Sequence, residues 1–591
     1  MKQFFKFMFA SMLGTFLTLI VVFFILMGIL TSVISMAERQ KVTVSENTVL
    51  HISLDHPIAD RTPKDPFGFY DMASQSFKKQ IGLNDILANI EKAGRDDKIR
   101  GIYLDIGMIP AGIATIEEIR QALIAFKEGS GKWVLCYGNG YTQSAYYLGT
   151  VADQIYLHPE GFLEFKGINL ETAFIKGTLE KLDVEPQVIR YGEYKGAVEP
   201  FIRDDLSEAN REQLTALATS VWNTMVNNMA SSRNIDPDIL NAIADEIGVW
   251  DPDNALEHRF VDKLAYKDEV HAELRLKLGL EEDEDINSMP IAKYTNAPDP
   301  VEREFTRDRI AVIYASGAIM QGEGGGEVIG AKTLSKAIRD ARKDEKVKAI
   351  VMRVNSPGGD ALASDVILRE VLLARNQKPF IVSMGDLAAS GGYWISCGAD
   401  HIVADPNTLT GSIGVFAMIP NMQGLFNEKL GITFDHVQTN ANSDFISITK
   451  PLPDYQEKIL EQVIDEVYQE FLERVSNGRQ MTTAGVDEIA QGRVWSGVDA
   501  KGIGLVDALG SLSDAIDVAA QMAELENFRL RELPEQKNPL EQLFEEVMGG
   551  SRVETALKNE LGEYYRYYEY INFIRDHQGV QARMPFTVRI Y

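Results

Sequence analysis

Three glycine-rich segments follow apolar runs in the second half of the chain, at 355–359 (NSPGG), 388–393 (AASGGY) and 410–414 (TGSIG). In the first segment, paired glycines allow a tight turn and leave backbone N–H groups uncovered, as an oxyanion hole requires. In the second, Ser390 lies at a strand-to-helix turn, where a serine hydroxyl can act as a nucleophile. Each segment alone is also a common turn sequence, but together they indicate acyl transfer through a serine.

A nucleophilic serine requires a base, and histidine is the usual one. His401 lies eleven residues after Ser390, and the other histidines are scattered, so no Ser-His-Asp triad can be assembled from the sequence. The alternative is a serine–lysine pair, in which an amine takes the hydroxyl proton. A lysine amine normally titrates at about 10.4, so burial must lower its pKa towards the ~7–8 of an effective base.

The chain contains the same domain twice, with an offset of about 247 residues. DDKIRGIYLDIG, which starts at residue 96, recurs as DEKVKAIVMRVN from residue 344, and ADQIYL at 152 recurs as ADHIVA at 399. A period this long indicates two globular domains, because solenoid repeats are far shorter.

The first copy lacks the candidate chemistry of the second. Gln143 aligns with Ser390, Phe165 aligns with Ser412, and MIPAG (108–112) replaces NSPGG. The pattern of apolar residues is retained, so we expect the first copy to keep the fold without this site.

SPGG, ASGGYW and TGSIG together resemble the signal peptide peptidase A family, also called protease IV, in its long double-domain form with a membrane anchor. In the first copy, 194–201 (YKGAVEPF) resembles the segment that carries the catalytic lysine of that family. The resemblance extends from the N-terminal apolar segment to about residue 525. It implies Ser390 as the nucleophile, Lys195 as the general base, and Ser412 as the residue that holds the lysine amine.

The same resemblance implies an oxyanion hole made by the backbone N–H groups of Gly358 or Gly359 and of Gly391. Lys195 aligns roughly with Ser443 in the second copy, so each copy lacks one member of the pair. We therefore expect the site to form only where the two domains meet, and neither half alone to hydrolyse peptides.

Short apolar runs alternate with helical patterns in both copies, which is typical of an α/β fold. The resemblance implies a tandem duplication of the spiral ββα domain shared by the Clp protease and crotonases. The predicted organisation is a cytoplasmic N-terminus and membrane anchor, an N-terminal domain, an acidic linker, a C-terminal domain, and a helical, tyrosine-rich extension, at 1–40, 41–280, 281–307, 308–525 and 526–591 respectively.

The N-terminal segment from Phe7 to Ala37 carries no charged residue and exceeds the roughly 20 residues needed to cross a bilayer. A cleaved signal peptide is the alternative, but its apolar core is usually about 7–15 residues long. Lys2 and Lys6 precede the segment, so we expect a cytoplasmic N-terminus. The family resemblance then places the anchor in a bacterial inner membrane, with the catalytic body on the periplasmic side.

The net charge of −27 argues against a nucleic-acid ligand, because phosphates are met by clustered basic residues. The two cysteines, Cys136 and Cys397, form no metal-binding motif, and we expect neither a metal nor a cofactor. The resemblance implies peptide substrates, namely remnant signal peptides and other unfolded hydrophobic segments, and a homo-oligomer, for which we expect a tetramer. Two alternatives remain open at this point: an inactive membrane scaffold of the same fold, and a crotonase-type acyl-CoA enzyme.

Overall fold

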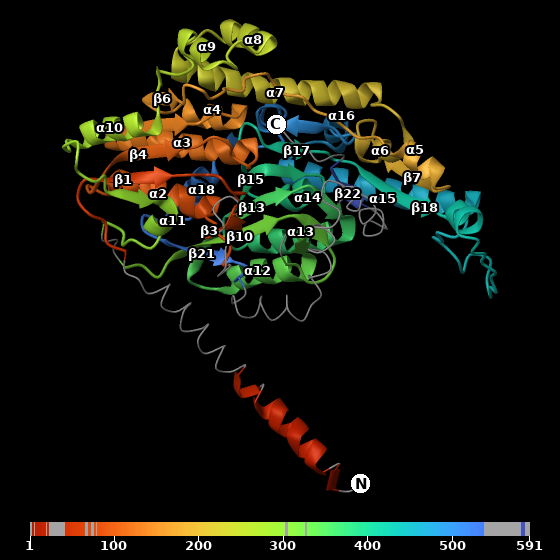
Figure 1. Cartoon of the computed structure of the whole chain (residues 1–591). Coiled ribbons are helices and arrows are strands. Elements are labelled where there is room, and N and C mark those ends of the chain that lie inside the picture. The colour runs from red at the N-terminus through yellow and green to blue at the C-terminus, as the bar shows by residue number, and fades with distance from the viewer. Residues whose placement is uncertain are drawn as a thin grey trace.

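Two α/β domains of the same design lie side by side in the computed structural model (Figure 1). Each domain has a wholly or mainly parallel sheet covered by helices, as the alternating sequence pattern predicts. The structure describes residues 3–4, 6–18, 20–22, 42–64, 69–71, 76–78, 80–301, 305–325, 328–536 and 581–584.

The first domain is built on a six-stranded sheet of order β8-β6-β5-β4-β1-β9, in which every neighbouring pair is parallel. Its strands are β1 Thr48–Ile52, β4 Ile99–Asp105, β5 Trp133–Gly138, β6 Gln154–Leu157, β8 Lys263–Leu264 and β9 Ser288–Pro290. Its helices are α2 Leu83–Arg95, α3 Ile113–Ser130, α4 Gln143–Gly149, α5 Lys176–Lys181, α6 Glu199–Ile202, α7 Glu208–Arg233, α8 Pro237–Glu246, α9 Pro252–Glu257, α10 Lys267–Leu278 and α11 Ile291–Tyr294.

The second domain has a similar sheet of order β19-β17-β15-β13-β10-β21, to which β16 and β20 are added. Its neighbouring strands are parallel except for β19, which runs antiparallel to β17. Its strands are β10 Arg309–Ser316, β13 Val347–Ser356, β15 Phe380–Ala389, β16 His401–Ala404, β17 Leu409–Gly411, β19 Val494–Ser496, β20 Ala508–Leu509 and β21 Arg529–Leu533. Its helices are α12 Ala331–Lys343, α13 Ala361–Arg375, α14 Gly391–Ser396, α15 Asp454–Arg479, α16 Thr483–Ile489, α17 Gly497–Gly502 and α18 Leu512–Met522.

The central strand β13 is apolar along its length because both of its faces are covered, as in other parallel sheets. Ile350, Met352 and Val354 pack into one core, whereas Ala349 and Val351 pack into a second core on the opposite face. The strand is therefore held firmly on both faces, and the glycine-rich segment 355–359 begins with its last two residues.

The duplication is visible in matching ion pairs at the ends of the two long helices. Arg233 binds Asp262 in the first domain, and Arg479 binds Asp507 in the second. Each aspartate also accepts the N–H at or near the start of a strand, in β6 and β16 respectively. These equivalent contacts confirm that the two copies share one design.

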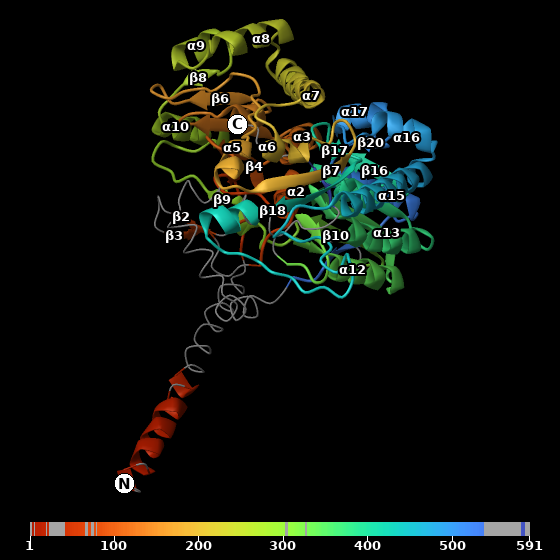
Figure 2. The same cartoon turned by 90° about the vertical axis from the view of Figure 1, so that its right-hand side faces the viewer.

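A third sheet joins the domains and contains strands from both copies, in the order β12-β11-β14-β22-β18-β7. Its strands are β7 Glu185–Tyr191, β11 Ala318–Met320, β12 Val328–Gly330, β14 Gly358–Asp360, β18 Val415–Asn421 and β22 Gln581–Arg583. β7 belongs to the first copy, yet it pairs with β18 of the second copy along its whole length (Figure 2). The segment that follows β7, which contains Lys195, is thereby carried into the second domain.

A buried arginine also locks the domains together. Arg353 of β13 has no exposed side-chain surface and forms ion pairs with two carboxylates of the first domain, Asp60 at 2.8 Å and Glu118 at 2.6 Å. Its third partner is Ser383 Oγ of β15, at 3.0 Å. Such a buried cluster is rigid because no partner can leave without stranding a charge.

The structure differs from the predicted domain boundaries in two places. The segment 281–307, predicted as a linker, contributes β9 and α11 to the first domain, and Tyr294 is fully buried there. The predicted helical extension begins with a strand, β21, which pairs with β10, while residues 537–580 lie outside the described residues. Both strands are short and lie next to charged residues, so the local sequence did not indicate that these segments form strands.

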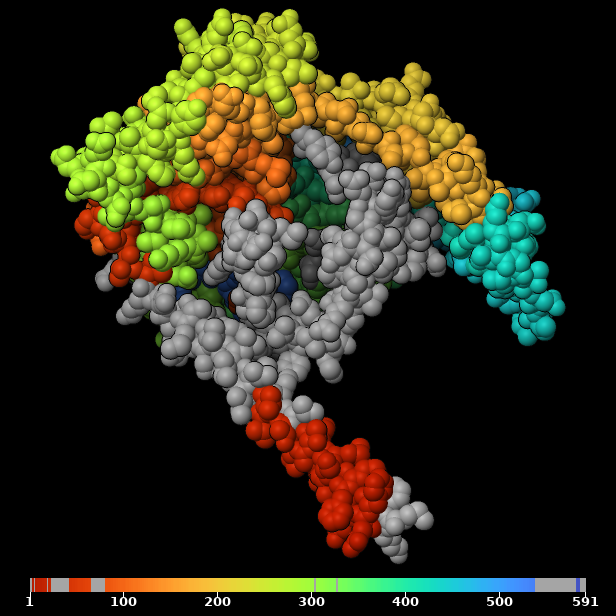
Figure 3. Space-filling model, in the orientation of Figure 1, coloured from red at the N-terminus to blue at the C-terminus, as the bar shows by residue number. Residues whose placement is uncertain are grey.

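The predicted membrane segment is described only in part. Residues 6–18 and 20–22 are helical with mostly exposed side chains (Figure 3), and residues 23–37 lie outside the described residues. No helix within the described ranges has both the length and the apolar character needed to span a bilayer.

We expect Arg353→Ala to lower the free energy of unfolding by about 3–5 kcal/mol, because it leaves two carboxylates buried without their cation. Urea denaturation followed by circular dichroism measures this loss. Lys336→Ala is the matched control, since Lys336 pairs with Asp340 on an exposed helix face and should matter by less than about 1 kcal/mol. Equal effects of the two substitutions would contradict the role of Arg353 in holding the two domains together.

Candidate active site

Ser390 occupies the turn between β15 and α14, where the sequence predicts a nucleophile. Its backbone has φ 56° and ψ −115°, a conformation that non-glycine residues rarely adopt, and its side chain is fully buried. The turn is held by the Ser390 N–H, which donates to Gly411 O at 2.8 Å. Strained backbone at such a turn is common where a side chain must be presented to a reaction centre.

Lys195 lies directly beside this serine, although 195 residues separate them in sequence. Its Nζ is 2.8 Å from Ser390 Oγ, 3.0 Å from Ser412 Oγ and 3.0 Å from Ser412 O. All three side chains are fully buried. The structure thus brings together the three residues that the sequence analysis selected, one from the first domain and two from the second.

The amine of Lys195 is desolvated, and no carboxylate of the described residues faces it. Burial lowers the pKa of Lys195 well below its usual value. The carboxylate of Glu199, four residues away, is instead bound by Asn210 Nδ2 at 3.0 Å and by the Ser207 N–H at 3.1 Å. Because burial disfavours the charged amine and no carboxylate offsets that effect among the described residues, the neutral form that can accept a proton is favoured.

The backbone around Lys195 is fixed by residues of both domains. Gln213 of α7 donates to Tyr194 O at 2.8 Å and accepts the Val494 N–H at 3.1 Å. Gly492 has a positive φ of 78°, and a Cβ there would lie 2.7 Å from the Cβ of Lys195. The sequence analysis missed Gln213 and Gly492 because their importance depends on contacts between distant segments.

The predicted oxyanion glycines line the turn beside Ser390, but they are not equivalent. The Gly358 N–H donates to Ser356 Oγ at 3.1 Å, so it is already engaged. A Cβ built on Gly391 would lie 3.0 Å from the Gly359 nitrogen, so these two residues are packed closely together. Gly391 also begins α14, where a helical N–H has no partner within the helix. The arrangement favours Gly359 and Gly391 over Gly358.

In the first copy, the residues at the positions equivalent to Ser390 and Ser412 make structural contacts and form no comparable site. Gln143 Oε1 accepts the N–H groups of Lys166 and Gly167, each at 3.0 Å. Phe165 is buried among aromatic rings, including that of Phe260. Ser443, the rough counterpart of Lys195, is exposed and lies in an irregular segment of the second domain.

His401, the alternative base, lies at the wrong end of the sheet. It pairs with Ile381 near the start of β15, whereas Ser390 follows the end of that strand. At about 3.3 Å per residue, the intervening strand separates them by about 25–30 Å. His401 therefore cannot serve Ser390 as a base in this structure.

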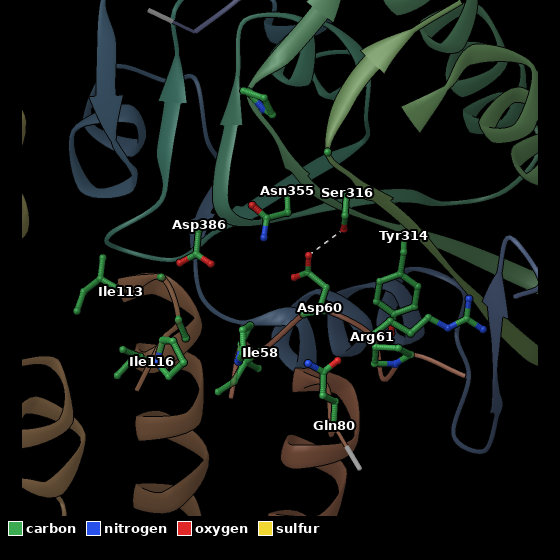
Figure 4. Close-up of a pocket in the computed structure, with 18 of the residues that line it drawn as sticks. Ile58, Asp60, Arg61, Gln80, Ile113, Ile116, Tyr314, Ser316, Asn355 and Asp386 are labelled. Carbon is green, nitrogen blue, oxygen red and sulfur yellow. Dashed lines mark hydrogen bonds between the residues drawn. The ribbon is translucent and has the colours of Figure 1, made fainter. Parts of the chain in front are cut away.

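A cavity of about 2240 Å³ lies between the domains, and its lining includes Pro357 and Leu409, which precede the glycine-rich turns of this site. Figure 4 shows Ile58, Ile113 and Ile116 on its wall, together with polar groups such as Asn355 and Asp386. Asp386 accepts the Thr115 hydroxyl at 2.6 Å, and burial raises the pKa of its carboxyl group. The cavity offers both apolar surface and hydrogen-bonding groups, as an extended peptide would require.

Comparison with known proteins gives matches to both domains. The family model described as Peptidase family S49 matches residues 127–281 and 373–526, which contain Lys195 and Ser390 respectively. Protease 4 of Salmonella typhi is 39% identical over 490 residues, covering 81% of this chain and 78% of that protein. Protease 4 of Haemophilus influenzae is 36% identical over 520 residues, covering 85% and 83%. The chloroplastic serine protease SPPA of Arabidopsis thaliana is 33% identical over 529 residues, covering 87% and 76%.

The burial of Lys195 predicts a specific dependence of stability on pH. Its pKa is lower in the folded than in the unfolded chain, so between these two pKa values the unfolded chain binds the extra proton and this group destabilises the fold. Lys195→Met removes that penalty. We expect the variant to gain stability relative to the unaltered chain at pH 7, and the gain to shrink as the pH rises towards about 10.4.

Urea denaturation of both proteins at several pH values between 7 and 10 measures this difference. Lys336→Met, at an exposed lysine, is the control and should show no such trend. A constant difference between Lys195→Met and the unaltered chain across this range would mean that Lys195 is charged in the folded protein.

Proposed function

The chain belongs to peptidase family S49 in its double-domain, signal peptide peptidase A form and is a serine peptidase, and from this premise we propose an endopeptidase with a serine–lysine dyad. Ser390 is the nucleophile, Lys195 the general base, and Ser412 the residue that holds the lysine amine. The observation that carries this proposal is the 2.8 Å contact between Lys195 Nζ and Ser390 Oγ, in a buried site where no carboxylate from the described part of the chain pairs with the lysine.

Acylation follows from the positions of these groups. A neutral lysine amine has two N–H donors and one lone pair; the carbonyl and hydroxyl oxygens of Ser412 accept the donors, and the lone pair faces Ser390 Oγ. As Oγ bonds to the substrate carbonyl carbon, its proton moves to Lys195. The N–H groups of Gly359 and Gly391 stabilise the oxyanion. Lys195 then protonates the departing nitrogen, and the C–N bond breaks to leave an acyl ester on Ser390.

Deacylation uses the same groups in the reverse sense. Neutral Lys195 takes a proton from a water molecule that attacks the ester carbonyl, and it returns that proton to Ser390 Oγ as the acid product leaves. Since the lysine and the serine come from different copies of the domain, we propose that neither half is active without the other.

The substrates that we propose are cleaved signal peptides and other unfolded hydrophobic peptides. The cavity between the domains supports this, because isoleucines of both α3 and the segment before α2 form part of its wall. A buried serine can be reached only by an extended chain, so a folded protein is a poor substrate.

We further propose that the apolar segment 7–37 anchors the enzyme in a bacterial inner membrane, with the catalytic body on the periplasmic side. Its length and lack of charge support an anchor. In addition, we propose that the chain forms a tetramer and that each copy adopts the spiral ββα architecture of the Clp protease and crotonases. The succession of a long strand, a short strand and a helix in β13, β14 and α13 supports this architecture.

Hydrolysis of a hydrophobic fluorogenic peptide tests the proposed dyad. We expect Ser390→Ala and Lys195→Ala each to reduce kcat/KM by at least about a thousandfold, because the two residues act as one unit. The double variant should be no worse than either single variant. For the unaltered enzyme, kcat/KM should rise with pH as Lys195 loses its proton, at a pKa below 10.5.

Circular dichroism and thermal unfolding establish that each variant is folded, and His401→Ala is the matched control that should keep its activity. If Lys195→Ala remained active, the base would have to be another residue. If the unaltered protein cleaved none of a varied peptide set, the inactive-scaffold alternative would replace the proposal.

A further inference from the structure

A short strand from the C-terminal end of the chain lies in the sheet beside the active site. β22 is placed between β14 and β18, and it runs antiparallel to the glycine strand with Gly359 opposite Ala582. The Met584 N–H continues this ladder by donating to Pro357 O at 2.7 Å. Extended peptides bind to the open edges of sheets by this same pattern of backbone hydrogen bonds.

The carbonyl oxygen of Ala582 lies among the glycines of the oxyanion hole. A Cβ built on Gly358 would be 2.2 Å from this oxygen and 2.5 Å from the Gly391 nitrogen. A Cβ built on Gly391 would be 2.9 Å from the same oxygen and 3.0 Å from the Gly359 nitrogen. The Ala582 carbonyl therefore occupies the place that the carbonyl of a bound substrate would need, next to Ser390.

The side chains of this strand fill pockets in the manner of a bound peptide. Ala582 is fully buried, and Met584 is 5% exposed within an apolar cluster that includes Ala389 and Leu409. Arg583, between them, contributes to the wall of the interdomain cavity. Alternate side chains thus point to opposite sides, with a small residue at the position nearest to the nucleophile.

We propose, on the basis of the function proposed above, that residues 581–584 are a tethered peptide ligand of the Ser390 site that competes with substrates. The strand lies in substrate register along the edge of β14, so a peptide can be cleaved only when this strand has left. Its small residue at Ala582 assigns a preference for small side chains to the position just before the cleaved bond. Tethering gives the strand an effective concentration in the millimolar range, which raises the apparent KM of every peptide substrate.

Two substitutions in the full chain displace the strand by different means. Met584→Pro removes the N–H that binds Pro357 O, and Ala582→Phe is too large for a fully buried alanine site. We expect each to lower the KM for a fluorogenic peptide by about tenfold at unchanged kcat. A synthetic peptide of residues 578–586 (QGVQARMPF) should inhibit both variants competitively, whereas the same peptide with phenylalanine in place of alanine should not.

A binding measurement separates this proposal from the proposed activity. In a Ser390→Ala background nothing can be cleaved, and the affinity for fluorescein-labelled 578–586 peptide is read by fluorescence anisotropy. We expect Ser390→Ala/Met584→Pro to bind about tenfold more tightly than Ser390→Ala alone. Equal affinities, with both proteins folded by circular dichroism, would overturn the tethered ligand. A lack of hydrolysis in every Ser390-containing protein would instead overturn the proposed function, and the binding result would still decide the role of the strand.

Discussion

The burial of one lysine amine without a counter-charge is the constraint on which the rest of this structure depends. A charged amine in an apolar interior is costly, and a carboxylate partner would relieve that cost but would also hold the proton. Here the partners of Lys195 are oxygens of two serines, which can bind the neutral amine. In the proposed mechanism, the protein keeps Lys195 available as a base at the cost of some stability, and the structure around the lysine must be rigid enough to hold it in place.

That rigidity comes from the way in which the two copies of the domain are joined. β7 extends a sheet of the second domain, Gln213 bridges the lysine segment to β19, and Arg353 binds two carboxylates of the first domain. None of these contacts would be needed if the copies were independent. The division of the proposed catalytic pair between the copies gives one reason why so many buried polar contacts lie at this boundary.

Much of this could be predicted from the sequence because the relevant signals are local. Short stretches of consecutive residues indicate both the strand-turn-helix position of Ser390 and the apolar parallel strands. The duplication is visible as repeated segments. The residues that orient Lys195 carry no such signal, since Gly492 matters only because the lysine backbone passes within van der Waals distance of it. Similarly, β9 and β22 are too short to be recognised without the strands against which they pair.

The division of the proposed catalytic pair between the two copies also has a consequence for how the protein is made. The lysine leaves the ribosome first, and the serine follows 195 residues later, which at about 5–20 residues per second means a delay of about 10–40 s. Until β18 has been synthesised and β7 has joined it, the lysine has no interior in which to lose its proton. With the proposed pair, a nascent chain that is still unfolded cannot digest itself or its neighbours, because the site is complete only when the fold is nearly complete.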